Sequence, residues 1–342
     1  MDKQQYKFRD KDVECYFETD FSYLKNLVTK EKAIIITDEN IASLHTEKFS
    51  GWKMIVLKAG EEHKQQLTVD HVINELINLQ ADRQTMIIGV GGGVVTDLAG
   101  YAASVYMRGI KCALIPTTIL AMVDACIGGK NGVDVGLYKN LVGTIRHAEF
   151  LLYDYSFLKT LPVVEWQNGF AEIIKHACIK DSTMFNELEK TSLENYFNGS
   201  ENIAKLIKRN VEIKYNIVAN DEFETGDRKL LNFGHTLAHA IENIYKLSHG
   251  NAVSIGMAAA CKIAKKINGF SSEDSNKVIG LLQKYNLPVD LEFDKEKVWE
   301  VLLKDKKKSG DVMNFILLNR IGEGIVKSIP LSQLKELINN LL

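Results

Sequence analysis

The sequence predicts two domains: an α/β domain with a parallel sheet up to about residue 160, and a mostly α-helical domain after it. In the first half, short runs rich in Ile and Val alternate with segments of helical periodicity, which is typical of a parallel sheet. After residue 160, long stretches have helical spacing and few strand signals appear. The length supports two domains, because 342 residues exceed the size at which one hydrophobic core usually stops growing.

The first half is expected to contain four strands and a helix between two of them. The strands are short apolar runs at 32–37, 53–58, 85–90 and 112–116. Helical spacing of Leu67, Val72 and Leu76 predicts a helix over 64–79. This order of elements predicts that the strands are parallel.

The second half is expected to be helical, with one late strand. Helices are predicted at 165–180, 199–219, 235–246 and 253–267, and a strand at 312–318. Because no low-complexity linker separates the halves, we expect domains 1–160 and 161–342 to pack closely, with a cleft between them.

Composition and charge exclude several classes of partner. The chain has 42 basic and 44 acidic residues, and its longest same-sign block is the short "KDKKKSG" at 304–310. With this balance the chain has no excess of positive charge that would bind nucleic acid or an anionic membrane. A small charged metabolite needs only a local cluster of charges.

Cysteine usage and the apolar runs predict a cytoplasmic protein. The five cysteines are an odd number and form no CxxC pair, which indicates reduced thiols. The first twenty residues lack the apolar core of a signal peptide, and the weakly polar run from Ala252 to Ala260 is too short to span a bilayer.

A glycine-rich turn, "IIGVGGGVVTDLAG" at 87–100, leads from an apolar strand into a helix expected to begin near Val94. Glycines allow close approach of a ligand, and a helix N-terminus offers N–H groups to a phosphate. The stretch does not fit GxGxxG, so a plain strand-to-helix turn is the alternative. Asp38 ends one neighbouring strand, and "GEEHK" at 60–64 follows the next. Together with the glycine-rich turn, these give three polar strand ends at one edge of the sheet, which favours a nucleotide site.

Three of the chain's eight histidines lie within fifteen positions of "LLNFGHTLAHAIENIYKLSHGNAVSIGM", residues 230–257. In a helix, His235 and His239 share one face at a spacing that lets two imidazoles bind one cation, and His249 follows the expected helix end. The best carboxylate candidate is Glu172, because Lys175 and His176 make its helix face polar. The residues alone do not decide which histidine is a ligand and which an acid or base.

Several cations lie beside glycines or polar clusters. For any single one, solvated surface charge is the common case, because Lys and Arg are seldom buried. Lys130 differs, since glycines precede it and Asp124 lies upstream. We expect a loop there in which the Lys130 ammonium meets a phosphate or carboxylate.

These residues belong to seven motifs that occur in a fixed order. They are "GVGGGVVTDLAGYAASVYMRG", "PTTILAMVDACIGGKNGVD", "YKNLVG", "NGFAEIIKHA", "RKLLNFGHTLAHAIE", "HGNAVSIGM" and "DKKKSG". Through them the chain closely resembles the 3-dehydroquinate synthase family of sugar phosphate cyclases, nearly end to end. The resemblance implies a dehydroquinate synthase-like fold, with an NAD-binding α/β domain at 1–160 and a helical metal- and substrate-binding domain at 161–342. It also implies one divalent metal, zinc or cobalt, and a homodimer.

The resemblance further implies a role for individual residues. It gives Glu172, His235 and His249 as metal ligands and leaves His239 to handle protons. Around the substrate's hydroxyls, carboxylate and phosphate it places Asp124, Lys130, Asn140, Lys175, Lys214, Arg228, Asn232 and one lysine of "DKK", Lys306 or Lys307. Arg108 would reach the phosphate of the neighbouring subunit's substrate. Assigned to the cofactor are Asp38, Glu61, Lys64, Gly92, Gly93, Asp97, Thr117, Thr118, Lys130 and Lys139.

The implied activity is that of a lyase of the shikimate pathway, which leads to aromatic amino acids. It would convert 3-deoxy-D-arabino-heptulosonate 7-phosphate to 3-dehydroquinate and phosphate. The implied steps are transient oxidation by NAD, phosphate elimination, re-reduction and intramolecular aldol closure. One alternative is a 2-deoxy-scyllo-inosose synthase, whose substrate has no carboxylate to meet Lys130. Another is a metal-dependent polyol or glycerol-phosphate dehydrogenase.

The chain departs from the family pattern at three places. Ala238 stands where the family usually has glycine, Asn251 stands where a glutamate is expected, and "GTIRHAEF" at 143–150 replaces the usual aromatic and "QP" pattern. None of these removes an implied ligand. The change at Asn251 deletes a carboxylate beside a metal ligand, which would alter the support of that ligand.

Overall fold

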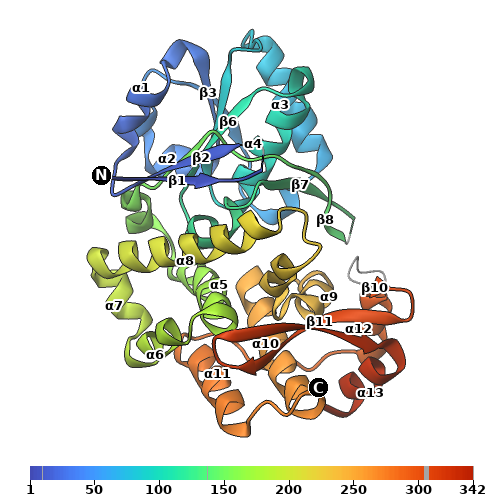
Figure 1. Cartoon of the computed structure of the whole chain (residues 1–342). Helices are drawn as coiled ribbons and strands as arrows, with labels where there is room; N and C mark the ends of the chain where they lie inside the picture. Colours follow the sequence, from blue (N-terminus) through green and yellow to red (C-terminus); the bar gives the residue numbers. More distant parts are fainter. Residues whose placement is uncertain (10, 137, 304–307, 342) are drawn as a thin grey trace. The chain divides into compact units, whose positions relative to one another are not determined.

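A computed structural model describes residues 1–9, 11–136, 138–303 and 308–341. By its internal contacts the chain forms two compact units (Figure 1). The first contains Met1–Glu165 and Ile203–Glu222, and the second contains Trp166–Asn202 and Phe223–Leu342. Most of helix α8, Ser200–Asn220, therefore belongs by its contacts to the α/β unit. The division into domains 1–160 and 161–342 stays a prediction.

The first unit is built on a seven-stranded sheet in the order β1-β2-β9-β6-β5-β3-β4. Its strands are β1 Asp2–Lys7, β2 Asp12–Phe17, β3 Ala33–Asp38, β4 Lys53–Leu57, β5 Met86–Gly91, β6 Lys111–Pro116 and β9 Phe150–Leu152. All neighbouring pairs are parallel except β1 with β2. The four strands expected in the first half, and their parallel arrangement, are confirmed.

The order of the strands defines where this sheet can hold a ligand. From β3 the chain passes to β4 on one side, and then crosses to β5 on the other side of β3. The helices that follow β4 and β5 are α3, Gln66–Asn78, and α4, Gly93–Val105. In such open sheets, ligands bind outside the carboxyl ends of the strands at the point where the strand order reverses. That point lies between β3 and β5.

Two hairpins of the first unit were not expected from the sequence. One is β1–β2, whose first strand "DKQQYK" has only one aromatic residue and no aliphatic ones. The other pairs β7, Lys130–Val135, with β8, Tyr138–Ile145. The expectation of a loop at Lys130 was therefore wrong, because this residue begins a strand. Backbone pairing with β8, from Lys130 with Ile145 onward, holds the segment extended.

The second unit is mostly helical, as expected (Figure 1). Its helices are α5 Val163–Lys180, which begins in the first unit, and then α6 Ser182–Lys190, α7 Leu193–Asn198, α9 His235–Tyr245, α10 His249–Ile267, α11 Ser272–Lys284, α12 Lys295–Leu302 and α13 Leu331–Leu341. A small sheet consists of β10 Lys308–Ser309, β11 Val312–Arg320 and β12 Glu323–Pro330. Helix α10 begins four residues before the expected 253, at His249, which matters for the site described below.

Shorter 3₁₀ and helical segments complete the chain. They are η1 Phe21–Tyr23, α1 Leu24–Leu27, η2 Lys30–Lys32, α2 Glu39–Leu44, η3 Thr46–Phe49, η4 Glu61–His63, η5 Tyr106–Arg108, η7 Tyr155–Thr160 and η8 Asp227–Asn232. A π-helical turn, η6, spans Ala121–Ala125.

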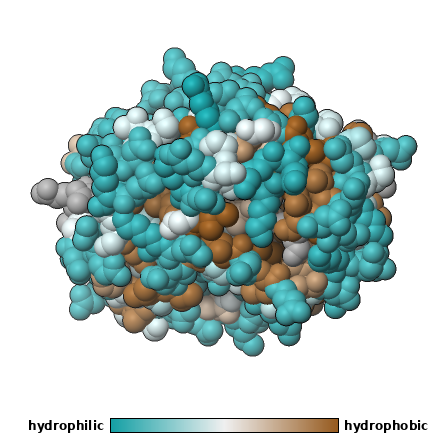
Figure 2. Space-filling view, turned by 90° about the horizontal axis from the view of Figure 1, so that it is seen from below, coloured by the Kyte–Doolittle hydropathy of each residue, from teal (hydrophilic) through white to brown (hydrophobic). Residues whose placement is uncertain are grey.

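The surface seen in Figure 2 is mainly hydrophilic, with hydrophobic residues exposed between the polar ones. Among the described helices, none combines the length and apolar character that crossing a membrane requires. All five cysteines are buried, and each is a free thiol. A cytoplasmic location stays a prediction.

Candidate metal and nucleotide sites

Three side chains from three helices of the second unit converge on one point. Glu172 lies in α5, whereas His235 and His249 are the first residues of α9 and α10. The Glu172 Oε1 atom is 3.6 Å from Nε2 of His235 and 3.3 Å from Nε2 of His249. One donor atom of each residue lies within 4.8 Å of the other two. This arrangement can hold a single cation.

Close helix packing explains why these residues meet. A Cβ atom on Gly250 would lie 2.5 Å from Cα of Asn168, so the start of α10 can touch α5 only with glycine there. A Cβ atom on Gly256 would lie 2.0 Å from the carbonyl oxygen of Gly234, the residue before α9. These two contacts draw the first turns of α9 and α10 toward each other and toward Glu172.

The second nitrogen of each imidazole has its own acceptor. His235 Nδ1 lies 3.2 Å from the carbonyl oxygen of Phe233, and His249 Nδ1 lies 3.3 Å from Oε2 of Glu242. With Nδ1–H donating to these oxygens, Nε2 of each ring is directed toward Glu172, where a cation would take the place of a proton. Burial alone would lower the pKa of His249, but hydrogen bonds to Glu172 and Glu242 raise that pKa to about 10.

His239 lies one helical turn after His235 and outside the group of three donors. Its ring centre is 5.5 Å from that of His235, with the rings nearly perpendicular. The side chain is half-buried. It therefore lies beside the cluster, where it could exchange a proton with a bound molecule.

One further assigned residue of the second unit contacts this cluster directly, and two others precede His235 in the sequence. The buried Lys175 ammonium forms an ion pair with the Glu172 carboxylate. Arg228 is buried, with 2% of its surface exposed, and Asn232 donates a hydrogen bond to Glu224. Lys306 and Lys307 lie outside the described residues.

In the first unit, the carboxyl ends of β3, β5 and β6 carry the residues assigned to the nucleotide. Asp38 ends β3 and accepts a hydrogen bond from the Ile41 amide at 3.0 Å, and burial raises the pKa of its carboxyl. Helix α4 begins directly after β5, with Gly92 as its N-cap and Gly93 as its first residue. Thr117 and Thr118 follow β6. Free N–H groups at a helix N-terminus make this edge suitable for a phosphate.

A polar network lies in the same unit, between the loop after β4 and the β7–β8 hairpin. Lys64 is buried, and its Nζ lies 2.5 Å from Oδ2 of Asp97 and 2.7 Å from Oδ1 of Asn140. Lys139 Nζ lies 2.6 Å from Oε1 of Glu61. Burial alone would lower the pKa of Lys64, but the carboxylates of Asp97 and Glu61 raise it above its ordinary value.

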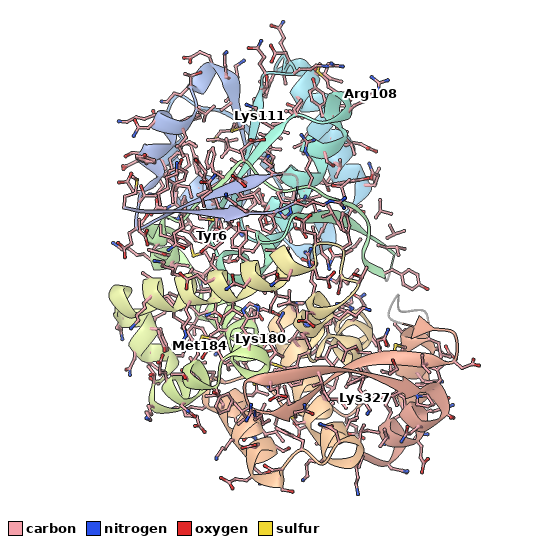
Figure 3. All side chains as sticks on the ribbon, viewed as in Figure 1. Tyr6, Arg108, Lys111, Lys180, Met184 and Lys327 are labelled. Atoms are coloured by element: carbon pink, nitrogen blue, oxygen red, sulfur yellow. The ribbon has the colours of Figure 1, made fainter. Side chains whose placement is uncertain are left out.

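The remaining assigned residues of this unit occupy three different positions. Lys214 of α8 reaches Asp124, with Nζ 2.9 Å from Oδ1 and 2.6 Å from the carbonyl oxygen. Lys130 has an exposed side chain at the start of β7. Arg108 is exposed and has a positive φ of 64°, and its side chain points away from the unit (Figure 3).

Sequence reasoning missed three carboxylates that contact assigned residues. Glu242 contacts His249, Glu224 contacts Asn232, and Asp134 accepts a hydrogen bond from the Asn140 amide at 2.7 Å. Glu242 had a signal in the sequence, because position 242 is two helical turns from His235 on the same face. Glu224 and Asp134 had none, since each contact depends on how a loop or hairpin folds back.

The departures from the family pattern leave the donor cluster intact. Ala238 is fully buried in α9, and Asn251 is half-buried in the first turn of α10. In the segment 143–150, the His147 ring stacks on Phe8 with centroids 3.8 Å apart. This segment therefore contributes to the packing of the first unit.

Comparison with known proteins gives matches over most of the chain. Residues 54–168 match the profile of the 3-dehydroquinate synthase N-terminal domain, and 169–308 match that of its C-terminal domain. The 3-dehydroquinate synthase of a Nitratiruptor species is 40% identical over 313 residues, covering 89% of this chain and 88% of that protein.

Two solved structures share the fold over nearly the whole chain. A 2-deoxy-scyllo-inosose synthase complexed with carbaglucose-6-phosphate, NAD+ and Co2+ is 26% identical, with a TM-score of 0.87 and 100% of both chains covered. The 2-epi-5-epi-valiolone synthase from Streptomyces hygroscopicus subsp. jinggangensis 5008, with NAD+ and Zn2+ bound, is 27% identical. Its TM-score is 0.88, with 98% of this chain and 97% of that one covered.

Proposed function

Because this chain belongs to the 3-dehydroquinate synthase family, we propose that it is the carbon–oxygen lyase that forms 3-dehydroquinate. Its substrate would be 3-deoxy-D-arabino-heptulosonate 7-phosphate, and its second product inorganic phosphate. The single observation that carries the proposal is the convergence of Glu172, His235 and His249 inside a chain that matches this family over 54–308. It is an enzyme of the shikimate pathway, which supplies aromatic amino acids.

The donor cluster fits one divalent metal. Two imidazole nitrogens and a carboxylate oxygen are the ligand types of catalytic zinc sites, and cobalt accepts similar ligands. Three protein ligands leave a coordination position for a substrate hydroxyl. Lys175 pairs with Oε2 of the buried Glu172 carboxylate, and Oε1 is the oxygen that faces the two imidazoles.

The carboxyl edge of the sheet fits NAD. Asp38 at the end of β3 could hold a ribose hydroxyl, and the turn before α4 could hold the diphosphate through Gly92 and Gly93. We assign Glu61, Lys64, Asp97, Thr117, Thr118, Lys130 and Lys139 to the same cofactor. When bound, the metal and the nicotinamide supply Lewis-acid and hydride-transfer chemistry.

The chain's own residues bind and orient the substrate and move protons. His239 would hold or transfer a proton beside His235. We assign substrate contacts to Asp124, Lys130, Asn140, Lys175, Lys214, Arg228, Asn232 and one of Lys306 and Lys307. Cations and amides at fixed positions bind a carboxylate and a phosphate while limiting the conformations of the flexible sugar.

We also propose a homodimer in which Arg108 reaches the substrate of the partner. Supporting this, large apolar side chains are exposed near the end of α4 and on β8, at Val105, Met107, Leu141, Val142 and Ile145. A hydrogen bond from Thr144 to Ser104 at 3.1 Å holds these two segments together. Exposed apolar groups of this kind mark interaction surfaces, and Arg108 directly follows Met107.

The alternative is a different cyclase activity, with glucose 6-phosphate as the substrate. It is suggested by the similarity to the 2-deoxy-scyllo-inosose synthase. The 40% identity to a 3-dehydroquinate synthase, against 26% for that enzyme, favours the heptulosonate. Lys130 also favours it, because an ammonium suits a substrate that has a carboxylate.

The test measures phosphate release by the purified protein, supplied with NAD and zinc. We expect release from the heptulosonate phosphate, little release from glucose 6-phosphate, and loss of activity with a chelator. Faster release from glucose 6-phosphate would replace the proposal by the alternative cyclase.

A further inference from the structure

Glu242 lies on the face of α9 that carries the histidines. His235, His239 and Glu242 follow each other at steps of four and three residues, which places their side chains along one side of the helix. The Glu242 side chain is buried, with 7% of its surface exposed. Its Oε2 lies 3.3 Å from Nδ1 of His249, the first residue of α10. The contact thus joins two helices at the donor cluster.

The two histidines of the cluster are held in unlike ways. His235 Nδ1 faces a neutral backbone carbonyl, that of Phe233, which side-chain substitution does not remove. His249 Nδ1 faces a carboxylate that belongs to a different helix. Only the acceptor of His249 can therefore be changed by a single substitution.

A carboxylate at Nδ1 has two effects on an imidazole ligand. It fixes the ring orientation and the tautomer, so that Nε2 presents its lone pair, and it increases the electron density at Nε2. Loss of such a partner typically weakens metal binding by about 10- to 100-fold.

We propose that Glu242 is a positioning residue for the metal site: it accepts the Nδ1–H of His249 and so holds Nε2 toward the cation. The inference rests on the proposed function, since it requires that Glu172, His235 and His249 bind a metal.

The experiment measures zinc affinity directly. Metal-free wild-type protein, Glu242→Ala and Glu242→Gln are titrated with Zn²⁺ against a chromophoric chelator at one pH, and urea unfolding of the metal-free proteins is recorded separately. The control is Glu273→Ala, which removes the same charge from α11, where Glu273 is exposed and paired with Lys277.

We expect Glu242→Ala to bind zinc about 10- to 100-fold more weakly than wild type. Glu242→Gln, which keeps an acceptor oxygen but loses the charge, should fall between them, and Glu273→Ala should equal wild type. The visible absorption spectrum of the Co²⁺-loaded protein should shift in the two Glu242 variants and stay unchanged in Glu273→Ala. Should Glu242→Ala fail to fold, the nearly isosteric Glu242→Gln carries the test.

Unchanged zinc affinity and an unchanged cobalt spectrum in folded Glu242 variants would overturn the inference, even if their metal-free forms were less stable. Failure of wild type itself to bind zinc or cobalt would instead refute the metal site of the proposed function. The two failures are therefore distinguishable.

Discussion

The Lys64 ammonium lies 2.5 Å from a carboxylate oxygen of Asp97, and the Lys64 side chain is only 6% exposed. The carboxylate raises the pKa of this lysine although burial opposes the shift. Lys64 follows η4 and Asp97 lies in α4, and both are among the residues proposed to bind NAD. The pair therefore contributes to the stability of the first unit.

Replacing Lys64 by Met should destabilise the protein, because it leaves the Asp97 carboxylate without its nearest cation. Breaking a buried pair in this way typically costs about 3–5 kcal/mol, and partial exposure of Asp97 reduces that value. Since folding raises the pKa of Lys64, its contribution is complete below the ordinary lysine value of 10.5 and is lost as the pH rises through the folded-state pKa.

Urea unfolding of wild type and Lys64→Met between pH 8 and 11 checks this expectation. The difference in unfolding free energy should be constant up to about pH 10 and shrink above it. A difference that grows with pH would show that the ion pair is not its source.

Replacing His235 or His249 by Ala should abolish bound metal and activity together, because three protein ligands leave little redundancy. His239→Ala should keep the metal and lose about two to four orders of magnitude in rate. Metal analysis and turnover of the three purified variants check this. Stoichiometric metal in the first two, or metal loss in the third, would mean that the roles are assigned wrongly.

Replacing Gly250 by Ala should destabilise the second unit and weaken zinc binding, because the new Cβ would lie 2.5 Å from Cα of Asn168. Overpacking of this kind costs about 1–3 kcal/mol. The matched control is Gly280→Ala in α11, where a Cβ meets nothing within 4 Å. That control should gain up to about 1 kcal/mol from helix propensity. Equal unfolding free energies for the two variants would contradict the close-packing explanation.

Replacing Lys130 by Ala should weaken substrate binding far more than NAD binding, by roughly ten- to a hundredfold, as expected for a charge-assisted contact. The control is Lys111→Ala, which changes another exposed lysine that begins a strand of the same unit (Figure 3). Steady-state kinetics check both variants. If Lys130→Ala keeps the wild-type KM and kcat, Lys130 is an ordinary surface charge.

The sequence predicted those parts of the fold that local patterns determine. The apolar runs of β3, β4, β5 and β6 marked a buried parallel sheet, and helical spacing marked α5 and α8–α10 within a few residues. The β1–β2 hairpin was not predicted because β1 is mostly polar on both faces and is held in the sheet by its pairing with β2. The β7–β8 hairpin escaped because Gly and Asn at its strands resemble a loop.

The candidate site was predictable in its residue types but not in its supporting contacts. His235 and His249 attracted attention because histidine is rare in this chain. The acceptors of their Nδ1 atoms were not predicted. Phe233 accepts with its backbone carbonyl, and Glu242 accepts across a contact between two helices. Helical spacing places Glu242 on the same face as His235, but its contact with His249 depends on how α9 packs against α10, which a single sequence does not show.

The fate of the nicotinamide hydride tests the central claim most directly. In a cyclase the oxidation is reversed within each turnover, so NAD is needed only in catalytic amount. A polyol or glycerol-phosphate dehydrogenase consumes one NAD per turnover and leaves the phosphate ester intact. We would follow nicotinamide absorbance and inorganic phosphate in the same cuvette with the heptulosonate phosphate as substrate. Phosphate should appear without reduced nicotinamide, whereas growth of the nicotinamide signal in step with substrate loss would contradict the account.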